Sequence, residues 1–298
     1  MNKIFSLVLS FILFGTCFVT PAQAAAKRYS VKYTWSAAQT QGWALDRINQ
    51  GYLNKLDGKY PKNREYGSGI TVYVIDTGIG FNDCNGHGSF VSSLIKSPEW
   101  GISQGVSIVS VKALGCDGSG SVSDVISAIN WVKSNANPST SIVNMSLGGP
   151  SDASINSAAN VLGNLMPVVV AAGNSATNAC SLSPAGAANV ITVAGLDPWH
   201  YRSMFSNYGP CVDIWAPATN IDGMTKDGVH KQESGTSAAA PLVSAAIAWI
   251  ADRDNVTTAQ AYQTILRESS DVQVINGYTT SKPFLLWLRD EPNPWYRY

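Results

Sequence analysis

The sequence predicts an α/β fold, in which a mostly parallel central sheet carries helices on both faces. Two observations predict it. After residue 67, short runs rich in Val and Ile alternate with longer segments whose apolar residues recur at helical spacing. Neither a repeat nor a low-complexity linker interrupts this alternation. Strands that alternate with helices in this way are typical of parallel sheets covered on both sides.

Each predicted strand is a short apolar run bounded by small or polar residues. The predicted strands span 70–76, 106–114, 141–146, 167–172 and 190–195. The predicted helices span 88–96, 121–135, 152–165, 236–252 and 257–268. In the helix at 121–135, Val and Ile residues recur at helical spacing behind Ser123, its predicted cap.

Length and composition limit the number of domains and the kinds of binding partner. A chain of 298 residues allows one large domain or two small ones. The 20 Lys and Arg residues cancel the 20 Asp and Glu residues, for a formal net charge of +0. Nothing therefore indicates nucleic acid or an anionic membrane surface as a partner.

The N-terminus is typical of a secretion signal. Lys3 precedes an apolar run at 4–19, and Pro-Ala-Gln-Ala at 21–24 offers a small-residue cleavage site. An uncleaved membrane anchor is the alternative, but the run is short for a spanning helix. We therefore expect residues 1–24 to be a signal peptide and the protein to be secreted or periplasmic.

Three segments carry side chains suited to nucleophilic hydrolysis. Ser237 opens a long apolar helix, whose unpaired N–H groups favour an attacking oxygen, although a serine there is also an ordinary helix cap. Asp76 ends the first predicted strand, and His87 stands between glycines before the next helix. Asp, His, Ser is one of the known chain orders of a serine-protease triad. In that reading Ser237 attacks, His87 is the general base and Asp76 orients the imidazole.

A fourth segment adds a donor for an oxyanion. The apolar strand at 167–172 breaks at Ala-Ala-Gly and presents Asn174. Its side-chain amide can donate to an oxyanion together with the backbone N–H of Ser237. The alternative is an ordinary turn residue, which a Gly-Asn pair also fits.

With these segments in place, the chain resembles a subtilase of the proteinase K type. The matching segments follow the family's order and cover roughly residues 38–270: Val-Ile-Asp-Thr-Gly-Ile at 74–79, Asn-Gly-His-Gly-Ser at 85–89, Gly-Ser-Gly at 118–120, Asn-Met-Ser-Leu-Gly-Gly at 144–149, Ala-Ala-Gly-Asn at 171–174, Phe-Ser-Asn-Tyr-Gly at 205–209 and Gly-Thr-Ser-Ala-Ala-Ala-Pro at 235–241. The resemblance implies a subtilisin-like three-layer fold and a serine endopeptidase that needs no cofactor for catalysis. It places the peptidase domain at 36–298, including an aromatic C-terminal tail.

The resemblance also implies how a polypeptide substrate would bind. Subtilases hold an extended peptide as an added strand between two backbone edges. One edge would be Gly118, Ser119 and Gly120, and the other Ser146, Leu147 and Gly148. The second edge would also wall the pocket for the residue before the cut, together with Ala171, Ala172 and Gly173. These small, uncharged residues predict a roomy, apolar pocket, unless the glycines only serve tight turns.

Cysteine usage agrees with export. Cys17 lies in the predicted signal peptide, and an even set remains: Cys84, Cys116, Cys180 and Cys211. Four cysteines suit disulfides in an oxidising compartment but allow three connectivities. The sequence around them resembles the aqualysin branch, which implies the pairs Cys84–Cys116 and Cys180–Cys211.

Two departures from the family bear on specificity and maturation. Only ten residues separate Asp76 from His87, so we expect part of the cleft rim to be missing. Residues 25–35 form only a short stub before a segment that resembles a mature N-terminus, so the sequence shows no standard inhibitory pro-domain. The residue after the nucleophile is Ala238, where the family usually has Met.

A metal site is implied more weakly. Asp213 lies in a segment that resembles a calcium site of the family, with backbone carbonyls near Ala188 and Val190 as further ligands. The alternative, that Asp213 only hydrogen-bonds nearby backbone, is equally compatible with the sequence. The two other histidines, His200 and His230, lie in polar segments and are expected at the surface.

Three classes of function remain open. The first is a secreted endopeptidase of broad specificity. The second is a protease of dedicated specificity, such as a toxin catalytic subunit, favoured by the trimmed cleft and by an aromatic tail that could meet a protein partner. The third, a catalytically silent binding protein, is disfavoured by the intact triad. An aspartic protease would need a second Asp-Thr-Gly motif or a dimer of short chains.

Overall fold

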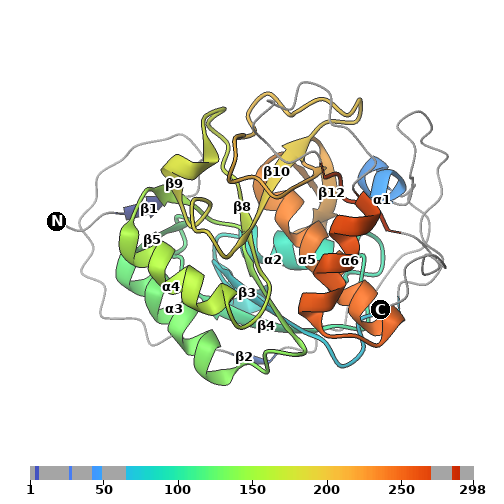
Figure 1. Ribbon diagram of the computed structural model, residues 1–298, viewed down its shortest axis with the longest axis horizontal. Helices are drawn as coiled ribbons and strands as arrows, with labels where there is room; N and C mark the ends of the chain where they lie inside the picture. Colours follow the sequence, from blue (N-terminus) through green and yellow to red (C-terminus); the bar gives the residue numbers. More distant parts are fainter. Residues whose placement is uncertain (1–3, 7–26, 29–41, 49–64, 270–283, 289–298) are drawn as a thin grey trace.

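Residues 4–6, 27–28, 42–48, 65–269 and 284–288 are described by the structure, a computed structural model shown in Figure 1. Most of the predicted signal peptide and stub, and the tail from residue 289, lie outside the described residues. No helix in the described ranges is long and apolar enough to cross a membrane.

A seven-stranded sheet forms the centre, in the order β11-β10-β8-β6-β3-β4-β2. Its strands are β2 (Lys27–Arg28), β3 (Thr71–Asp76), β4 (Ser107–Lys112), β6 (Ser141–Met145), β8 (Val168–Ala171), β10 (Ile191–Leu196) and β11 (Ile214–Pro217). All neighbours are parallel except β2, which runs antiparallel to β4. The five predicted strands are confirmed.

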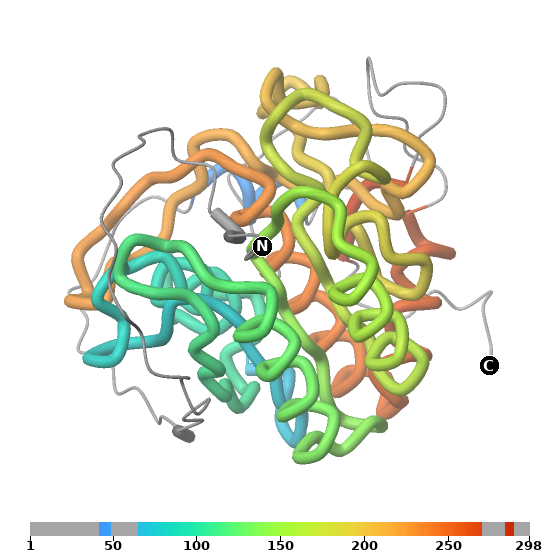
Figure 2. Tube along the Cα trace, turned by 90° about the vertical axis from the view of Figure 1, so that its left-hand side faces the viewer, coloured from blue at the N-terminus to red at the C-terminus, as the bar shows by residue number. Residues whose placement is uncertain are grey.

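Helices cover both faces of this sheet, as predicted. One layer holds α3 (Val122–Asn135) and α4 (Ala153–Gly163), and the other holds α2 (His87–Lys96), α5 (Thr236–Asp254) and α6 (Thr258–Ser269). The short α1 (Trp43–Ile48) packs near β11. Figure 2 is viewed from the side of α3 and α4, with α5 in orange behind the sheet.

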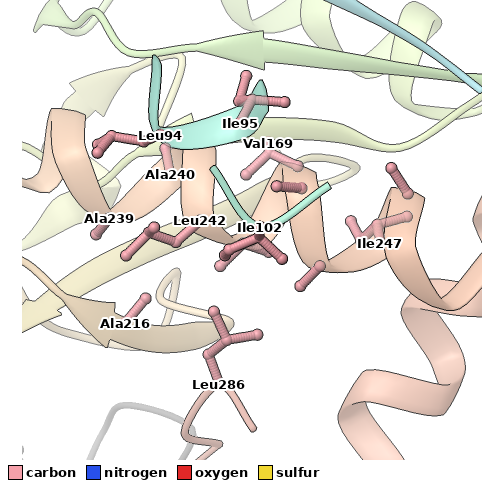
Figure 3. Packing of buried hydrophobic residues seen from close by; sticks show 14 of the residues in the cluster. Leu94, Ile95, Ile102, Val169, Ala216, Ala239, Ala240, Leu242, Ile247 and Leu286 are labelled. Atoms are coloured by element: carbon pink, nitrogen blue, oxygen red, sulfur yellow. The ribbon is translucent and has the colours of Figure 1, made fainter. Parts of the chain in front are cut away.

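The second layer is built around α5, whose residues 238–251 are all buried. A helix that is apolar all round belongs in the interior. Figure 3 shows Leu94 and Ile95 of α2, with Val169 of β8, gathered against the small side chains of α5. Alanines such as Ala239 and Ala240 allow this close approach, so the start of α5 is held firmly at the sheet.

Several short strands lie outside the main sheet and were not predicted. They form three antiparallel pairs: β1 (Ile4–Ser6) with β5 (Ser119–Ser121), β7 (Gly149–Pro150) with β9 (Leu182–Ser183), and β12 (Ile221–Met224) with β13 (His230–Glu233). The 3₁₀ turns η1 (Gly80–Asn82) and η2 (Ala179–Ser181) complete the described elements.

Two details of the sequence interpretation were wrong. The cap of α3 is Ser121, not Ser123, because the helix begins at Val122 and Ser121 accepts a hydrogen bond from the Asp124 amide at 3.1 Å. His200 is buried, with only 7 % of its surface exposed, whereas it was expected at the surface. Burial, with the charge of Arg47, lowers the pKa of His200 to about 4.

Candidate active site

Neighbouring parallel strands end at one edge of the sheet, which is where α/β folds build their sites. β3 ends at Asp76, and α2 follows with His87 as its first residue. β6 ends just before Ser146, and β8 ends at Ala171. α5 begins at this edge and carries Ser237 in its first turn. The predicted side chains therefore converge, although they are far apart in the sequence.

Asp76 and His87 form a buried pair. The Nδ1 of His87 lies 2.7 Å from Oδ1 of Asp76, whose side chain is fully buried. The Thr77 amide donates to the same oxygen at 2.7 Å, while Oδ2 is buried and has no hydrogen-bond partner among the described residues. A carboxylate bonded to Nδ1 fixes the imidazole tautomer and leaves Nε2 as the basic nitrogen.

The environment of His87 sets its pKa. Burial lowers this pKa, but the charge and hydrogen bond of Asp76, assisted by Glu233 and Asp83, outweigh burial and raise it above its ordinary value. The imidazolium is therefore stabilised at this position. Such an environment suits a group that accepts a proton during a reaction.

The turn after β3 is packed directly onto the start of α2. A Cβ atom on Gly88 would lie 2.1 Å from the carbonyl oxygen of Gly78, so only glycine allows this approach. Asp83, fully buried, accepts hydrogen bonds from the backbone N–H groups of Gly86 at 2.7 Å and Ser89 at 2.8 Å. The shortened stretch between Asp76 and α2 is thus an ordered loop.

The backbone around Ser237 is fixed by a proline. Pro241 lies four residues on in α5 and has no N–H, so the Ser237 carbonyl lacks its helical donor. The Ser146 hydroxyl supplies that bond at 2.8 Å. Ser146 in turn accepts from the Asn144 amide at 2.9 Å, and Ser244 of α5 donates to Asn144 at 2.9 Å. This buried polar chain locks α5 to the end of β6.

α2 and α5 pack against each other, which brings His87 and Ser237 to the same region. In the described part of the chain no hydrogen bond joins the two side chains. Hydrogen bonds of catalytic groups are often long in the absence of substrate and tighten when it binds.

Asn174 is oriented by its neighbours. Its Oδ1 accepts from both the backbone N–H and the hydroxyl of Thr236, each at 2.8 Å. The amide nitrogen therefore points away from Thr236; a Cβ on Gly235 would lie 3.2 Å from it. An amide anchored through its oxygen presents its N–H groups as fixed donors beside the start of α5.

Comparison with known proteins identifies the family of this chain. The sequence profile described as the subtilase family matches residues 55–282. The chain belongs to the subtilase family.

Curated subtilase-like relatives cover most of this chain. An alkaline serine exoprotease A of Vibrio alginolyticus is 36% identical over 272 residues, 83% of this chain and 50% of the relative. An extracellular serine proteinase of Thermus sp. (strain Rt41A) is 38% identical over 231 residues, 69% of this chain and 56% of the relative. The chain thus spans about half the length of these relatives.

A solved structure extends the comparison to the fold. The crystal structure of a cold-adapted subtilisin-like serine proteinase superposes with a TM-score of 0.78 at 35% sequence identity. The match covers 84% of this chain and 98% of that chain. The subtilisin-like three-layer fold expected from the sequence is therefore confirmed.

The two backbone edges expected to hold a substrate in this subtilase lie at the same end of the sheet. Ser119 and Gly120 belong to β5, which Gly118 precedes in a left-handed conformation. Leu147 and Gly148 connect β6 to β7. The backbone of β1 already pairs antiparallel with β5, with Phe5 opposite Gly120. The β5 edge can therefore receive an added strand.

The segment after β8, which was expected to line the pocket, is organised by a residue that sequence reasoning did not assign. Asn207 is fully buried and donates to the Ala172 carbonyl at 2.8 Å. Its own amide donates to the Gly173 carbonyl, and its side-chain oxygen accepts from the Ser175 amide. Asn207 was recognised only as part of a family motif. Its central place in a segment of small polar residues was the available signal.

Both disulfides implied by the resemblance are present in the structure. Cys84 is bonded to Cys116, and Cys180 to Cys211. The first joins the loop before α2 to the loop before β5, where the Asn85 side chain also donates to the Cys116 carbonyl at 3.0 Å. It therefore connects the segment that carries His87 to the expected substrate edge.

The segment implied as a calcium site shows a hydrogen bond to the Asp213 side chain. Oδ2 of Asp213 accepts a hydrogen bond from the Thr192 amide at 2.9 Å, as the alternative reading expects. The described residues contain no group of three or more His, Cys, Asp or Glu side chains that could hold a metal. A cation here would be held by a single carboxylate together with backbone carbonyls, which are oxygen ligands of the kind that calcium accepts.

Proposed function

We propose that this chain is a secreted serine endopeptidase that hydrolyses polypeptides through Asp76, His87 and Ser237. The observation that carries the proposal is the buried 2.7 Å contact between Asp76 and the Nδ1 of His87, formed where α5 presents Ser237. The subtilase family supports the same activity, since the relatives described above are named as serine proteases.

The chemistry follows from the positions of these groups. Ser237 Oγ attacks the scissile carbonyl while Nε2 of His87 takes its proton and later returns it to the leaving amine. Asp76 holds the tautomer and stabilises the imidazolium. The amide of Asn174 and the backbone N–H of Ser237 donate to the tetrahedral oxyanion. Subtilase catalysis needs no cofactor.

Substrate binding is proposed to use the two backbone edges. An extended peptide would add to β5 at 118–120 and face 146–148 on its other side. The antiparallel pairing of β1 with β5 supports this mode. The residue before the cut would enter a pocket lined by 146–148 and 171–173, where Leu147 and Ala171 are buried apolar side chains. We expect a preference for apolar residues there.

Export is proposed from three features. Residues 1–24 have the pattern of a signal peptide, the cysteines are paired, and relatives include an extracellular proteinase. The mature domain is proposed to begin near residue 36.

One observation favours the alternative of a dedicated protease. The loop between Asp76 and α2 consists of ten residues and carries Phe81, whose side chain is fully exposed. A cleft with a trimmed rim makes fewer contacts with a peptide on that side. Cleavage-site profiling on a peptide library distinguishes a narrow from a broad specificity.

Labelling with a fluorophosphonate tests the proposal. The reagent should modify Ser237 in the wild-type chain, whereas Ser237→Ala should be unlabelled and lose peptidase activity. Because the triad acts as a unit, His87→Ala should cost about as much, on the order of 10⁴-fold or more. Ser127→Ala, an exposed serine on α3, is the matched control and should label normally. Undiminished turnover by purified Ser237→Ala would refute the mechanism.

A further inference from the structure

We propose that Asp83 is a positioning residue for the general base, whose carboxylate ties the loop before His87, the first turn of α2 and the end of β3 into one unit. This inference rests on the proposed function, because Asp83 would act through His87. The evidence is a set of hydrogen bonds around one fully buried carboxylate.

The carboxylate of Asp83 is surrounded by donors. Oδ1 accepts from the Thr77 hydroxyl at 2.8 Å, the Gly86 amide at 2.7 Å and the Asn85 amide at 3.2 Å. Oδ2 accepts from the Ser89 amide at 2.8 Å. A buried carboxylate with this many donors is held in one orientation.

Asp83 contributes to the cap of α2. The helix starts after Gly86, which has a left-handed conformation and makes no side-chain cap. The Ser89 N–H has no partner within the helix and donates to Asp83, and the Gly88 N–H donates to the Thr77 hydroxyl at 2.9 Å. First-turn N–H groups need such partners, and a carboxylate there also suits the helix dipole.

Thr77 extends the unit to the triad itself. Its hydroxyl bridges Asp83 and Gly88, while its amide donates to Asp76. The acid that orients His87 and the helix that carries His87 are thus fixed to each other through the amide and the hydroxyl of one residue. The distance between Asp76 and the imidazole therefore depends on Asp83.

An asparagine cannot reproduce this arrangement. Both oxygens of Asp83 accept hydrogen bonds, whereas an amide has only one oxygen. In Asp83→Asn, the NH₂ group would face either the Ser89 amide or the cluster of donors at Thr77. One set of bonds must break, and the start of α2 must shift.

Charge around His87 gives a second readout. The charged groups that act on it are Asp76, Glu233 and Asp83, each of which raises its pKa. Lys112 of β4 lies near the two aspartates and donates to the Thr77 carbonyl. Removing the charge of Asp83 removes one raising contribution, so the pKa of His87 should fall. The acid limb of kcat/KM should then move to lower pH.

The experiment compares Asp83→Asn and Thr77→Val with Asp152→Ala. Asp152 caps α4 through the Ser154 amide at 2.9 Å and serves as the matched control for a lost helix cap. Rates are measured per active site, titrated with a fluorophosphonate, at temperatures well below each melting point. We expect kcat to fall about 10- to 100-fold in Asp83→Asn, with KM nearly unchanged, as expected for a misplaced base.

The three variants should also separate in pH dependence. Asp83→Asn should move the acid limb to lower pH, and Thr77→Val should lower kcat without moving it, because the charge remains. Asp152→Ala should lower the melting temperature and leave kcat and the acid limb unchanged.

The possible failures are distinguishable. A wild-type chain that neither labels at Ser237 nor cleaves peptides overturns the proposed function and, with it, this role. An active wild type whose Asp83→Asn variant keeps both kcat and acid limb overturns the role alone, since Asp83 would then be only a cap. If Asp83→Asn does not fold, the Thr77→Val variant tests the proposal instead. A kcat equal to that of the wild type in Thr77→Val would refute the proposal.

Discussion

The oxygen of the Asn174 side chain is already engaged by Thr236, through both the hydroxyl and the backbone amide. The same hydroxyl accepts from the Gly173 amide at 3.0 Å. One threonine hydroxyl thus joins the start of α5 to the segment after β8. An oxyanion donor that is preoriented in this way needs little rearrangement when charge develops.

A substitution at Thr236 tests this orientation. Thr236→Val keeps the backbone donor to Asn174 but removes the hydroxyl, so we expect kcat to fall roughly 10-fold. Asn174→Ala should cost more, roughly 10²–10³-fold, because the donor itself is lost. Steady-state kinetics on a peptide substrate measures both. A larger loss in Thr236→Val than in Asn174→Ala would show that the threonine has another role.

The pKa of His87 leads to a prediction about pH. Only neutral His87 can accept a proton. Burial lowers the pKa of His87, but Asp76, Glu233 and Asp83 together outweigh burial and raise this pKa. Activity should therefore fall as the pH drops through a value above about 6.5, the ordinary histidine pKa. The acid limb of kcat/KM reports this value for the free enzyme. A midpoint clearly below that of an ordinary histidine would contradict the charge arrangement described here.

Folding stability should respond in the opposite direction. A histidine whose pKa is raised on folding stabilises the folded state most below its unfolded pKa. That contribution is lost as the pH rises through the folded value.

At the scale of elements, the Cys84–Cys116 disulfide connects the loop before α2 to the loop before β5, and Cys180–Cys211 connects η2 to the loop before β11. Closing a loop of about thirty residues contributes roughly 3–4 kcal/mol on the chain-entropy model. Both disulfides should therefore stabilise the fold by similar amounts. They differ in the segments that they connect.

We expect Cys84→Ser to lower kcat/KM as well as the melting temperature. The bridge holds the loop that contains Asp83 against the loop before β5. Cys180→Ser is the matched control and should lower mainly the melting temperature. Thermal denaturation and peptide kinetics on both variants make the comparison. Equal activity in the two variants would show that the short loop keeps its place without the bridge.

The start of α5 has a further consequence for oxidation. Ala238, next to Ser237, is buried and has no sulfur to oxidise. A methionine there could become a bulky sulfoxide beside the nucleophile. We therefore expect peroxide to spare activity, as measured by residual turnover after treatment. The Ala238→Met variant serves as the comparison and should lose activity on peroxide treatment. Rapid inactivation of the wild type by peroxide would contradict the prediction.

For the molecule as a whole, sequence patterns predicted the parallel strands and their covering helices, because each is long enough to show its periodicity. Short elements such as β12 and β13 carry too few residues for a pattern. Asp83 and Thr236 escaped notice because their roles depend on donors that folding brings together. The burial of His200 was missed for the same reason, since its polar neighbours in sequence did not show that the fold encloses it.

The pairing of β1 with β5 has one more consequence. A strand edge accepts one neighbour, so residues 4–6 and a peptide compete for the backbone of 119–121. A segment of the same chain competes at an effective concentration on the order of millimolar. The full chain should thus have a higher KM for peptides than a chain starting at residue 25, with similar kcat. Equal KM values would show that residues 4–6 do not compete with a peptide for this edge. The expected difference would show that removal of the predicted signal peptide makes the β5 edge available to substrate.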